Sequence, residues 1–369
     1  MLTAACLDRG RFEVEVWCGP QTGSEGSLIE ACRRRGVAVR VFPHLVRELS
    51  PVQDALVVLD LTRAMRAASF EVVHTHSSKA GIVGRAAARA AGVPHIVHTV
   101  HGWGFHDRTP AVRRRLYGLL ERWAARFTER LITVSERDIR KGLSEGIGTR
   151  EQYRTIRSAI ELDPFRDPPE PAQTRRDLGI PGGSPLVITV GRISEQKDPA
   201  TLLAVARRVH ARRSDIHYLW VGDGPMRQRL EEEIARLGLA DLFHVLGLRD
   251  DVPKLLAAAD VFLLTSRWEG LPRVLPQAMA AGLPVVATAV DGSPEAVSEG
   301  ETGYLCPPGD VEALAARLLQ LIENPTLARA MGRAGRERVT PEFDVRDMVS
   351  RIAALYDEIL QPGSPRTSK

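Results

Sequence analysis

Strand-like and helix-like segments alternate along most of this chain, and that alternation limits the folds it can adopt. Runs rich in β-branched and aromatic residues recur in both halves, at 12–17, 37–42, 72–74, 95–99, 131–134, 186–190, 217–221, 243–246, 261–265 and 284–288. Helix-like segments such as 81–91 and 111–128 separate them. Strands that alternate with helices pair in parallel, because each helix carries the chain back across the sheet. The sequence therefore predicts an α/β protein with parallel sheets.

Two domains are expected from the length of 369 residues, because each half is long enough to bury its own core. Pro168, Pro169 and Pro171 predict a stiff, extended linker. We predict four segments, with a Rossmann-like domain at 1–166, a second at 167–344, a closing helix at 345–360 and a disordered tail at 361–369. The two Rossmann-like domains are expected to face a central cleft.

The start of the chain departs from this pattern. A Rossmann-like domain opens with a strand and a tight glycine turn, whereas residues 1–9 look like the end of a helix. A strand and its loop in a βα unit take roughly 20–30 residues. We therefore expect the first strand of the N-terminal domain to be missing from this sequence, either because the start codon is placed too late or because the chain is a fragment.

Positive charge is concentrated in the first half. Residues 1–166 hold 26 Lys and Arg against 18 Asp and Glu, whereas the rest of the chain holds 24 against 28. A basic half predicts an anionic partner such as a phospholipid surface, although solvated arginine-rich helices would give the same count. In the segment 112–130, arginines recur among apolar residues at roughly helical spacing, as in helices that lie on membranes. Nothing in the sequence predicts a nucleic-acid partner.

The cysteines and the apolar runs indicate the compartment. Cys6, Cys18, Cys32 and Cys306 lack paired or metal-type spacing, which predicts reduced thiols. No apolar run reaches the length of a membrane-spanning helix, and the start lacks the layout of a secretory signal. We predict a cytoplasmic protein with peripheral contact at the inner face of the membrane.

The loop after the strand at 186–190 carries two cations. Gly191 permits a sharp turn, and Arg192 and Lys197 follow it. Asp198 is predicted to cap the next helix, so helix amides lie beside the cations. Arg binds phosphate oxygens through a planar fork and Lys supplies a compact charge. The loop predicts a diphosphate site, with an ordinary solvated basic loop as the alternative.

The loop after the strand at 261–265 carries hydroxyl-binding groups. Glu269 lies in this loop, and Gln277 lies near the start of a helix predicted at 273–281 and ended by Gly282. A carboxylate accepts hydrogen bonds from vicinal hydroxyls, and an amide both accepts and donates. These groups predict a sugar site, with an isolated surface charge as the alternative.

Histidines gather after two strands of the first half, in HTVHGWGFH at 98–106 and at His74 and His76. The spacing lacks the carboxylate or cysteine set of a usual zinc site. His101, beside Gly102, is predicted to hydrogen-bond a substrate. The chain also has no Asp-x-Asp pair, no G-x-S-x-G elbow and no P-loop. We predict no cofactor and no metal.

Taken together, these segments resemble the retaining GT-B-fold glycosyltransferases of family 4, a family that includes relatives of sucrose synthase and bacterial mannosyltransferases. The resemblance covers roughly 12–360, and its most specific parts are GRISEQK, GDGP, EGLPRVLPQAMAAGLPVVAT, DGSPEAV and GETGYLCPPGD. HTHSSKAGIVGR and HTVHGWGF are similar to members that build capsular or extracellular polysaccharide.

The resemblance implies roles for particular residues. Arg192 and Lys197 would neutralise the donor diphosphate in place of a metal. Glu269 would contact hydroxyls of the donor sugar, and His101 would face that sugar from the other domain. Further donor-binding positions are implied at Gly191, Gly270, Leu271, Gln277, Leu246, Gly247 and Leu248.

On the acceptor side, the resemblance implies contacts from His76, Lys79 and Ser135, and it implies that the closing helix crosses back to the first domain. The chain departs from the family in two motifs. The usual Glu-x7-Glu pattern ends in Gln277, and Ser158 begins a Ser–Ala pair where an asparagine–glycine pair is usual.

We therefore predict a retaining, metal-independent glycosyltransferase. It would move a hexosyl unit from a UDP- or GDP-sugar to a sugar or lipid-linked acceptor, in polysaccharide or glycolipid assembly. One alternative is a sugar-nucleotide 2-epimerase of the same fold, which would turn over without an acceptor. Others are a catalytically impaired sugar-nucleotide-binding protein and a membrane-associated scaffold built on 112–130.

Overall fold

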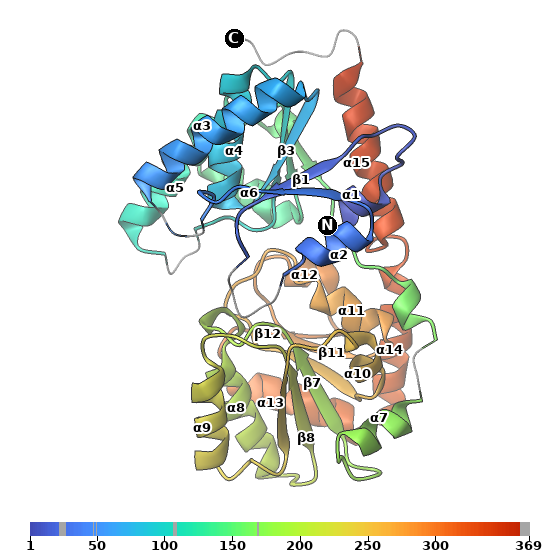
Figure 1. The fold of residues 1–369 in the computed structure, drawn as a ribbon. Helices are drawn as coiled ribbons and strands as arrows, with labels where there is room; N and C mark the ends of the chain where they lie inside the picture. The colour runs from blue at the N-terminus through green and yellow to red at the C-terminus, as the bar shows by residue number, and fades with distance from the viewer. Residues whose placement is uncertain (22–26, 47, 49, 106–108, 168–169, 362–369) are drawn as a thin grey trace. The chain divides into compact units, whose positions relative to one another are not determined.

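The fold is taken from a computed structural model, which describes residues 1–21, 27–46, 48, 50–105, 109–167 and 170–361 (Figure 1). The chain divides into two compact units. Unit 1 comprises Met1–Ser158 and Val345–Lys369, and unit 2 comprises Ala159–Asp344. Both units contain parallel strands and helices, so the predicted α/β class with two Rossmann-like units is confirmed.

Unit 1 contains a four-stranded parallel sheet and a separate parallel pair. The sheet runs in the order β3 (Val72–His76), β4 (His95–Val100), β5 (Arg130–Thr133) and β6 (Tyr153–Thr155). The pair consists of β1 (Glu15–Cys18) and β2 (Ala38–Val41). Every residue of β4 is buried, because a central parallel strand is covered on both faces.

The helices of unit 1 come from both ends of the chain. They are α1 (Leu2–Cys6), α2 (Ile29–Arg34), α3 (Pro51–Ala68), α4 (Ser78–Ala91), α5 (Ala111–Ala125), α6 (Glu136–Ser144), the 3₁₀ turn η1 (Arg150–Gln152) and α15 (Val345–Leu360). The observed bounds of α15 equal those predicted for the closing helix. α15 packs against α1, and Arg11 donates to the Asp357 carboxylate at 2.6 Å. The last helix therefore belongs to the same unit as the first.

Unit 2 is built on one six-stranded parallel sheet. Its strand order is β12 (Gly303–Cys306), β11 (Val285–Thr288), β10 (Val261–Leu264), β7 (Leu186–Val190), β8 (His217–Val221) and β9 (Phe243–Gly247). The bounds of β7 and β8 equal the predicted ones. Since β7 comes first in the chain and lies between β10 and β8, the strand order reverses beside it. In open α/β sheets, ligands bind outside the carboxyl ends of the strands at such a reversal.

The remaining elements of unit 2 surround this sheet. They are η2 (Asp163–Phe165), α7 (Pro171–Asp177), η3 (Glu195–Lys197), α8 (Pro199–His210), α9 (Arg227–Arg236), α10 (Val252–Ala257), α11 (Val274–Ala280), α12 (Ser293–Ala296), α13 (Val311–Glu323) and α14 (Pro325–Val339). Trp220 is fully buried in the core, and its Nε1 donates to the Gly191 carbonyl at 2.9 Å. The largest core side chain thus supports the backbone of a predicted site residue.

The division between the units falls earlier than the predicted boundary at 166. Ile160 N donates to the Phe343 carbonyl at 2.9 Å, and Ile160 forms a parallel bridge with Asp344. Phe165 is buried, and its 3₁₀ turn packs against α10. Residues 159–166 therefore lie in unit 2, whose first and last residues are neighbours.

The predicted linker is only partly described. Pro168 and Pro169 lie outside the described residues, as do residues 362–369 of the predicted tail. Pro171 begins α7, so the prediction of extended chain was wrong there. A proline fits the first position of a helix because its φ is already helical and its missing N–H has no partner there in any case.

Candidate active site

The loops after β7 and β10 meet in an ion pair at the reversal of strand order. The Lys197 ammonium contacts the Glu269 carboxylate, and the two side chains are only 11% and 7% exposed. Charged groups are rarely buried unless they are paired, because each loses its hydration. The structure therefore brings two predicted catalytic residues together as the charged centre of unit 2.

Three loops fix the orientation of Glu269. The Ser266 hydroxyl donates to its Oε1 at 2.6 Å, and the Gln196 amide donates to its Oε2 at 3.2 Å. The backbone N–H of Glu269 donates to the Asp291 carboxylate at 2.7 Å. These partners follow β10, β7 and β11, so Glu269 is held from three strand ends, through its carboxylate from the first two and through its backbone from the third. A group held in this way is preorganised for binding.

A second ion pair locks the loop after β7. Arg267 contacts the Asp198 carboxylate at 2.8 Å and Glu195 at 3.3 Å. The hydrogen bond to Asp198 raises the pKa of Arg267. Asp198 also accepts from the Thr201 backbone at 3.4 Å and from its hydroxyl at 2.8 Å, so its predicted role as helix cap is confirmed. The carboxylate of Asp198, which follows Lys197 in the chain, therefore makes structural contacts with Arg267 and Thr201.

Glycines let the loops after β7, β8 and β9 pack backbone against backbone. Gly222 has a φ of 144°, and a Cβ there would lie 2.1 Å from the Gly191 carbonyl oxygen. Gly191 N donates to the Val221 carbonyl at 2.9 Å, and Gly222 N donates to the Gly247 carbonyl at 2.8 Å. Predicted donor-binding residues Gly191 and Gly247 therefore belong to one backbone network, next to half-buried Arg192.

The other predicted donor-binding residues lie in and after β9 and in the segment that follows β10. Leu246 is half-buried at the end of β9 and Leu248 is exposed beyond it. The Gly270 carbonyl accepts from Gly292 N at 2.8 Å, and Leu271 is buried. Half-buried Gln277 is the fourth residue of α11. All of them stand at the carboxyl edge of the sheet.

Three histidines stack along the sheet of unit 1. The ring centroids of His74 and His76 are 4.5 Å apart, and those of His76 and His101 are 5.3 Å apart. His76 Nδ1 lies 3.1 Å from His101 Nε2, whereas His74 lies 2.6 Å from the Tyr356 hydroxyl and 2.7 Å from that of Thr99. Burial, with a smaller contribution from His101, lowers the pKa of His74 to about 3. His74, at one end of the stack, is therefore a neutral imidazole near neutral pH.

No group of three His, Cys, Asp or Glu among the described residues is arranged to hold a metal ion. His74, His76 and His101 are therefore not such a group, within the part of the chain that the structure describes.

Two residues predicted on the acceptor side serve the fold. The Lys79 ammonium donates to the Val46 carbonyl at 2.9 Å and to the Glu48 carbonyl, and its charge pairs with the Asp54 carboxylate at 2.6 Å. Ser135 is fully buried and caps α6, accepting from Asp138 N at 3.1 Å. Lys79 therefore anchors a loop and Ser135 caps a helix, and contact of either residue with an acceptor stays a prediction.

Several residues that shape these sites were not predicted. Ser266 and Asp291 hold Glu269, and Tyr356 and Thr99 hold His74. Ser266 was detectable because it lies two residues after the buried strand β10 and three residues before Glu269. Tyr356 gave no such signal, because only the folded chain brings it to β3.

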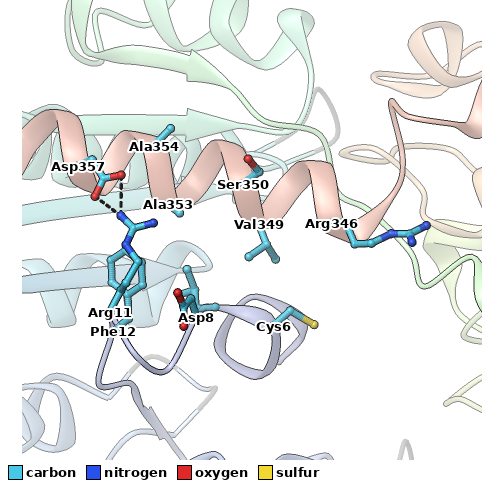
Figure 2. A pocket seen from close by; sticks show the side chains of 11 residues that line it. Cys6, Asp8, Arg11, Phe12, Arg346, Val349, Ser350, Ala353, Ala354 and Asp357 are labelled. Carbon is cyan, nitrogen blue, oxygen red and sulfur yellow. Dashed lines mark hydrogen bonds and ion pairs between the residues drawn. The ribbon is translucent and has the colours of Figure 1, made fainter.

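A cavity of about 450 Å³ lies elsewhere in unit 1, beside α1 and α15 (Figure 2). Arg11 and Asp357 form an ion pair on its wall, and Cys6, Phe12 and Ser350 also line it. None of the predicted catalytic or binding residues lines this cavity, so it is separate from the histidine stack.

Comparison with known families gives two matches that together cover most of the chain. Residues 1–157 match the glycosyl transferase 4-like domain, and residues 172–338 match the glycosyl transferases group 1. The UDP-Gal:alpha-D-GlcNAc-diphosphoundecaprenol alpha-1,3-galactosyltransferase of Escherichia coli is 31% identical over 333 residues, which cover 88% of this chain and 85% of the relative. The 2-deoxystreptamine glucosyltransferase of Streptomyces kanamyceticus is 33% identical over 76% of this chain and 74% of its own.

Solved structures share the fold at low sequence identity. HepE of Anabaena, in complex with UDP and glucose, superposes with a TM-score of 0.82 at 23% identity and covers 94% of this chain and 100% of its own. The sucrose-phosphate synthase of Thermosynechococcus elongatus superposes with a TM-score of 0.78 at 23% identity, covering 94% and 99%. Among the described residues, no helix combines the length and apolarity needed to cross a membrane.

Proposed function

The chain belongs to the group 1 glycosyltransferases, and on that basis we propose that it moves a hexosyl unit from a nucleoside-diphosphate sugar to an acceptor hydroxyl. The transfer retains the anomeric configuration and needs no metal. The observation that carries the proposal is the buried Lys197–Glu269 pair at the strand-order reversal of unit 2. A cation for diphosphate and a carboxylate for sugar hydroxyls stand side by side there.

The donor is proposed to be a UDP-sugar, with a GDP-sugar as the alternative. The Escherichia coli relative is named for UDP-Gal, and structures of HepE contain UDP and UDP-glucose. The acceptor is proposed to be a sugar or a lipid-linked sugar, because the same relative is named for a diphosphoundecaprenol acceptor. The pathway would then be polysaccharide or glycolipid assembly.

Catalysis is proposed to rest on electrostatic stabilisation of the leaving diphosphate by Arg192 and Lys197. Glu269 is held by Lys197, Ser266 and Gln196, which favours hydroxyl binding over nucleophilic attack. Attack from the same face as the departing group, through an oxocarbenium-like state, would then retain configuration. The chain has no Asp-x-Asp pair, the motif whose carboxylates would bind a divalent metal ion at the diphosphate. A role for Arg192 and Lys197 in place of that ion agrees with this feature of the sequence.

Calorimetric titration of the purified chain with UDP and with GDP, in EDTA, tests the donor site. Micromolar binding of one nucleotide supports the proposal and identifies the donor class. Absence of binding by either nucleotide, in protein shown to be folded by circular dichroism, contradicts it.

A transfer assay separates the remaining alternatives. Release of UDP or GDP that requires an acceptor supports the transferase. Turnover of the donor without an acceptor would support the 2-epimerase, which has no support among the relatives reported above. Nucleotide binding without any turnover would support a sugar-nucleotide-binding protein.

A further inference from the structure

Helix α5 carries a stripe of large apolar side chains that faces solvent. Its members are Val112, Leu116, Leu119 and Trp123, which are 79%, 46%, 58% and 45% exposed. They are spaced by four, three and four residues, so they lie on one face of the helix. The opposite face, which includes Gly118 and Ala124, is buried in unit 1. A continuous exposed apolar stripe marks an interaction surface.

Arginines flank this stripe. Arg113, Arg115 and the helix-capping Arg126 are exposed. The single acidic residue of α5, Glu121, is buried and accepts from Arg85 at 2.5 Å. The solvent-facing side of α5 therefore offers apolar groups and positive charge together. We refer to Val112, Arg113, Arg115, Leu116, Leu119, Trp123 and Arg126 as the α5 face.

Other arginines of α5 are used within unit 1. Arg114 pairs with Glu145 through a short contact, and Arg122 donates to the Glu145 carbonyl at 2.8 Å. These contacts fix the helix on α6 and determine which side it turns outward. The orientation of the stripe toward solvent is thus built into the packing of unit 1.

We propose that the α5 face docks on an anionic phospholipid bilayer. Apolar side chains enter the boundary of the acyl chains while arginines bind lipid phosphates, as on helices that lie in a membrane interface. A second copy of the chain is a poorer partner, because a symmetric contact would set the arginines of one copy against those of the other. Docking goes beyond sugar transfer, and only its link to a lipid-linked acceptor rests on the proposed function.

Vesicle sedimentation with the full chain tests the docking. We expect binding to phosphatidylcholine vesicles that contain phosphatidylglycerol, and little binding to phosphatidylcholine alone. Each arginine near an anionic surface contributes about fivefold to binding, so Arg113→Gln with Arg115→Gln should weaken it about 10- to 30-fold. The matched control is Arg329→Gln with Arg333→Gln, two exposed arginines of α14 in unit 2, which should bind like the unmodified chain.

Tryptophan fluorescence identifies the inserted residue. Brominated phosphatidylglycerol should quench emission of the unmodified chain, and Trp123→Phe should lose most of this quenching while it still sediments with vesicles. Leu116→Ser with Leu119→Ser should lose sedimentation, with thermal unfolding monitored to show that the fold is intact.

Three results would overturn the proposal. These are equal binding to vesicles with and without phosphatidylglycerol, quenching that persists in Trp123→Phe, and a dimer of the unmodified chain that Leu116→Ser with Leu119→Ser dissociates. The last result would make the α5 face an interface between copies of the chain. The readouts are independent of nucleotide binding, so they stand apart from the tests of sugar transfer.

Discussion

The Tyr356 hydroxyl lies 2.6 Å from Nδ1 of His74, a residue 282 positions earlier in the chain. This contact joins α15 to β3 within unit 1. Since His74 stacks on His76, and His76 on His101, the last helix supports the predicted substrate-binding histidine through two rings.

Replacing Tyr356 by Phe should lower the free energy of unfolding by about 1 kcal/mol, because a buried hydrogen bond is lost while the ring remains. Urea unfolding measures the change. The matched control is Tyr218→Phe, whose buried hydroxyl has no hydrogen-bond partner among the described residues, and it should be neutral or slightly stabilising. Equal effects of the two substitutions would contradict the anchoring role of Tyr356.

Stability should fall as the pH is lowered through the range in which free histidine takes up a proton. His74 has a pKa of about 3 in the fold, because of burial first and His101 second, against 6.5 in the unfolded chain. Between these values the unfolded chain binds the additional proton, so the free energy of unfolding decreases from about pH 6.5 downward and is unaffected by His74 above it.

From about pH 7 to about pH 5, His74 alone should account for about 1–2 kcal/mol of this decrease. Urea unfolding at both values, with His74→Gln as the comparison, measures its share. His98 is also buried with a lowered pKa, so the substitution should reduce the pH dependence without abolishing it. An unchanged pH dependence in His74→Gln would show that His74 titrates normally.

Replacing Lys197 by Ala should reduce kcat/KM about 10²- to 10³-fold, the usual effect of removing one preorganised electrostatic group. Lys254→Ala is the control, because this lysine of the same unit forms a more exposed pair with Asp177 at 3.5 Å. Steady-state transfer assays measure both, and comparable rates for the two variants would remove Lys197 from the catalytic set.

The same lysine should also contribute to stability, because its loss leaves the Glu269 carboxylate buried without a cation. We expect a decrease of about 3 kcal/mol in Lys197→Ala. Adding Glu269→Gln should recover part of the stability but none of the activity. Recovery of both would mean that the ion pair serves the fold alone.

Gly222→Ala should destabilise unit 2 by about 2–4 kcal/mol and abolish nucleotide binding, because its φ of 144° and the nearby Gly191 carbonyl leave no room for a Cβ. Gly182→Ala is the control, since no atom of the described residues lies within 4 Å of a Cβ at that position. Thermal unfolding and calorimetry distinguish them, and similar behaviour would mean that the backbone network tolerates displacement.

The sequence predicts an element most accurately where the residue types and the burial of a segment indicate the same structure. β7 and β8 are fully buried strands of mostly apolar residues, and their observed bounds equal the predicted ones. Asp198 also behaves as its position before a proline suggests. Short strands such as β6 and β12 were not predicted, because runs of three or four residues carry little periodicity.

Contacts between distant segments were harder to predict. Lys197 and Glu269 were both predicted as site residues, but their pairing depends on β7 lying beside β10, which neither loop encodes alone. Lys79 and Ser135 have the residue types of a binding site. The structure adds partners that the sequence did not indicate, which include Asp54 for Lys79 and Asp138 for Ser135.

The bridge between Ile160 and Asp344 makes the chain enter and leave unit 2 at adjacent residues. Unit 2 is therefore a single uninterrupted insertion in the chain of unit 1. An exchange of residues 159–344 between relatives would need two breakpoints that lie close together in space. The contacts within unit 1 would stay unchanged. Recombination of whole units would thus exchange the proposed donor site together with the core that supports it, without passing through partly folded intermediates.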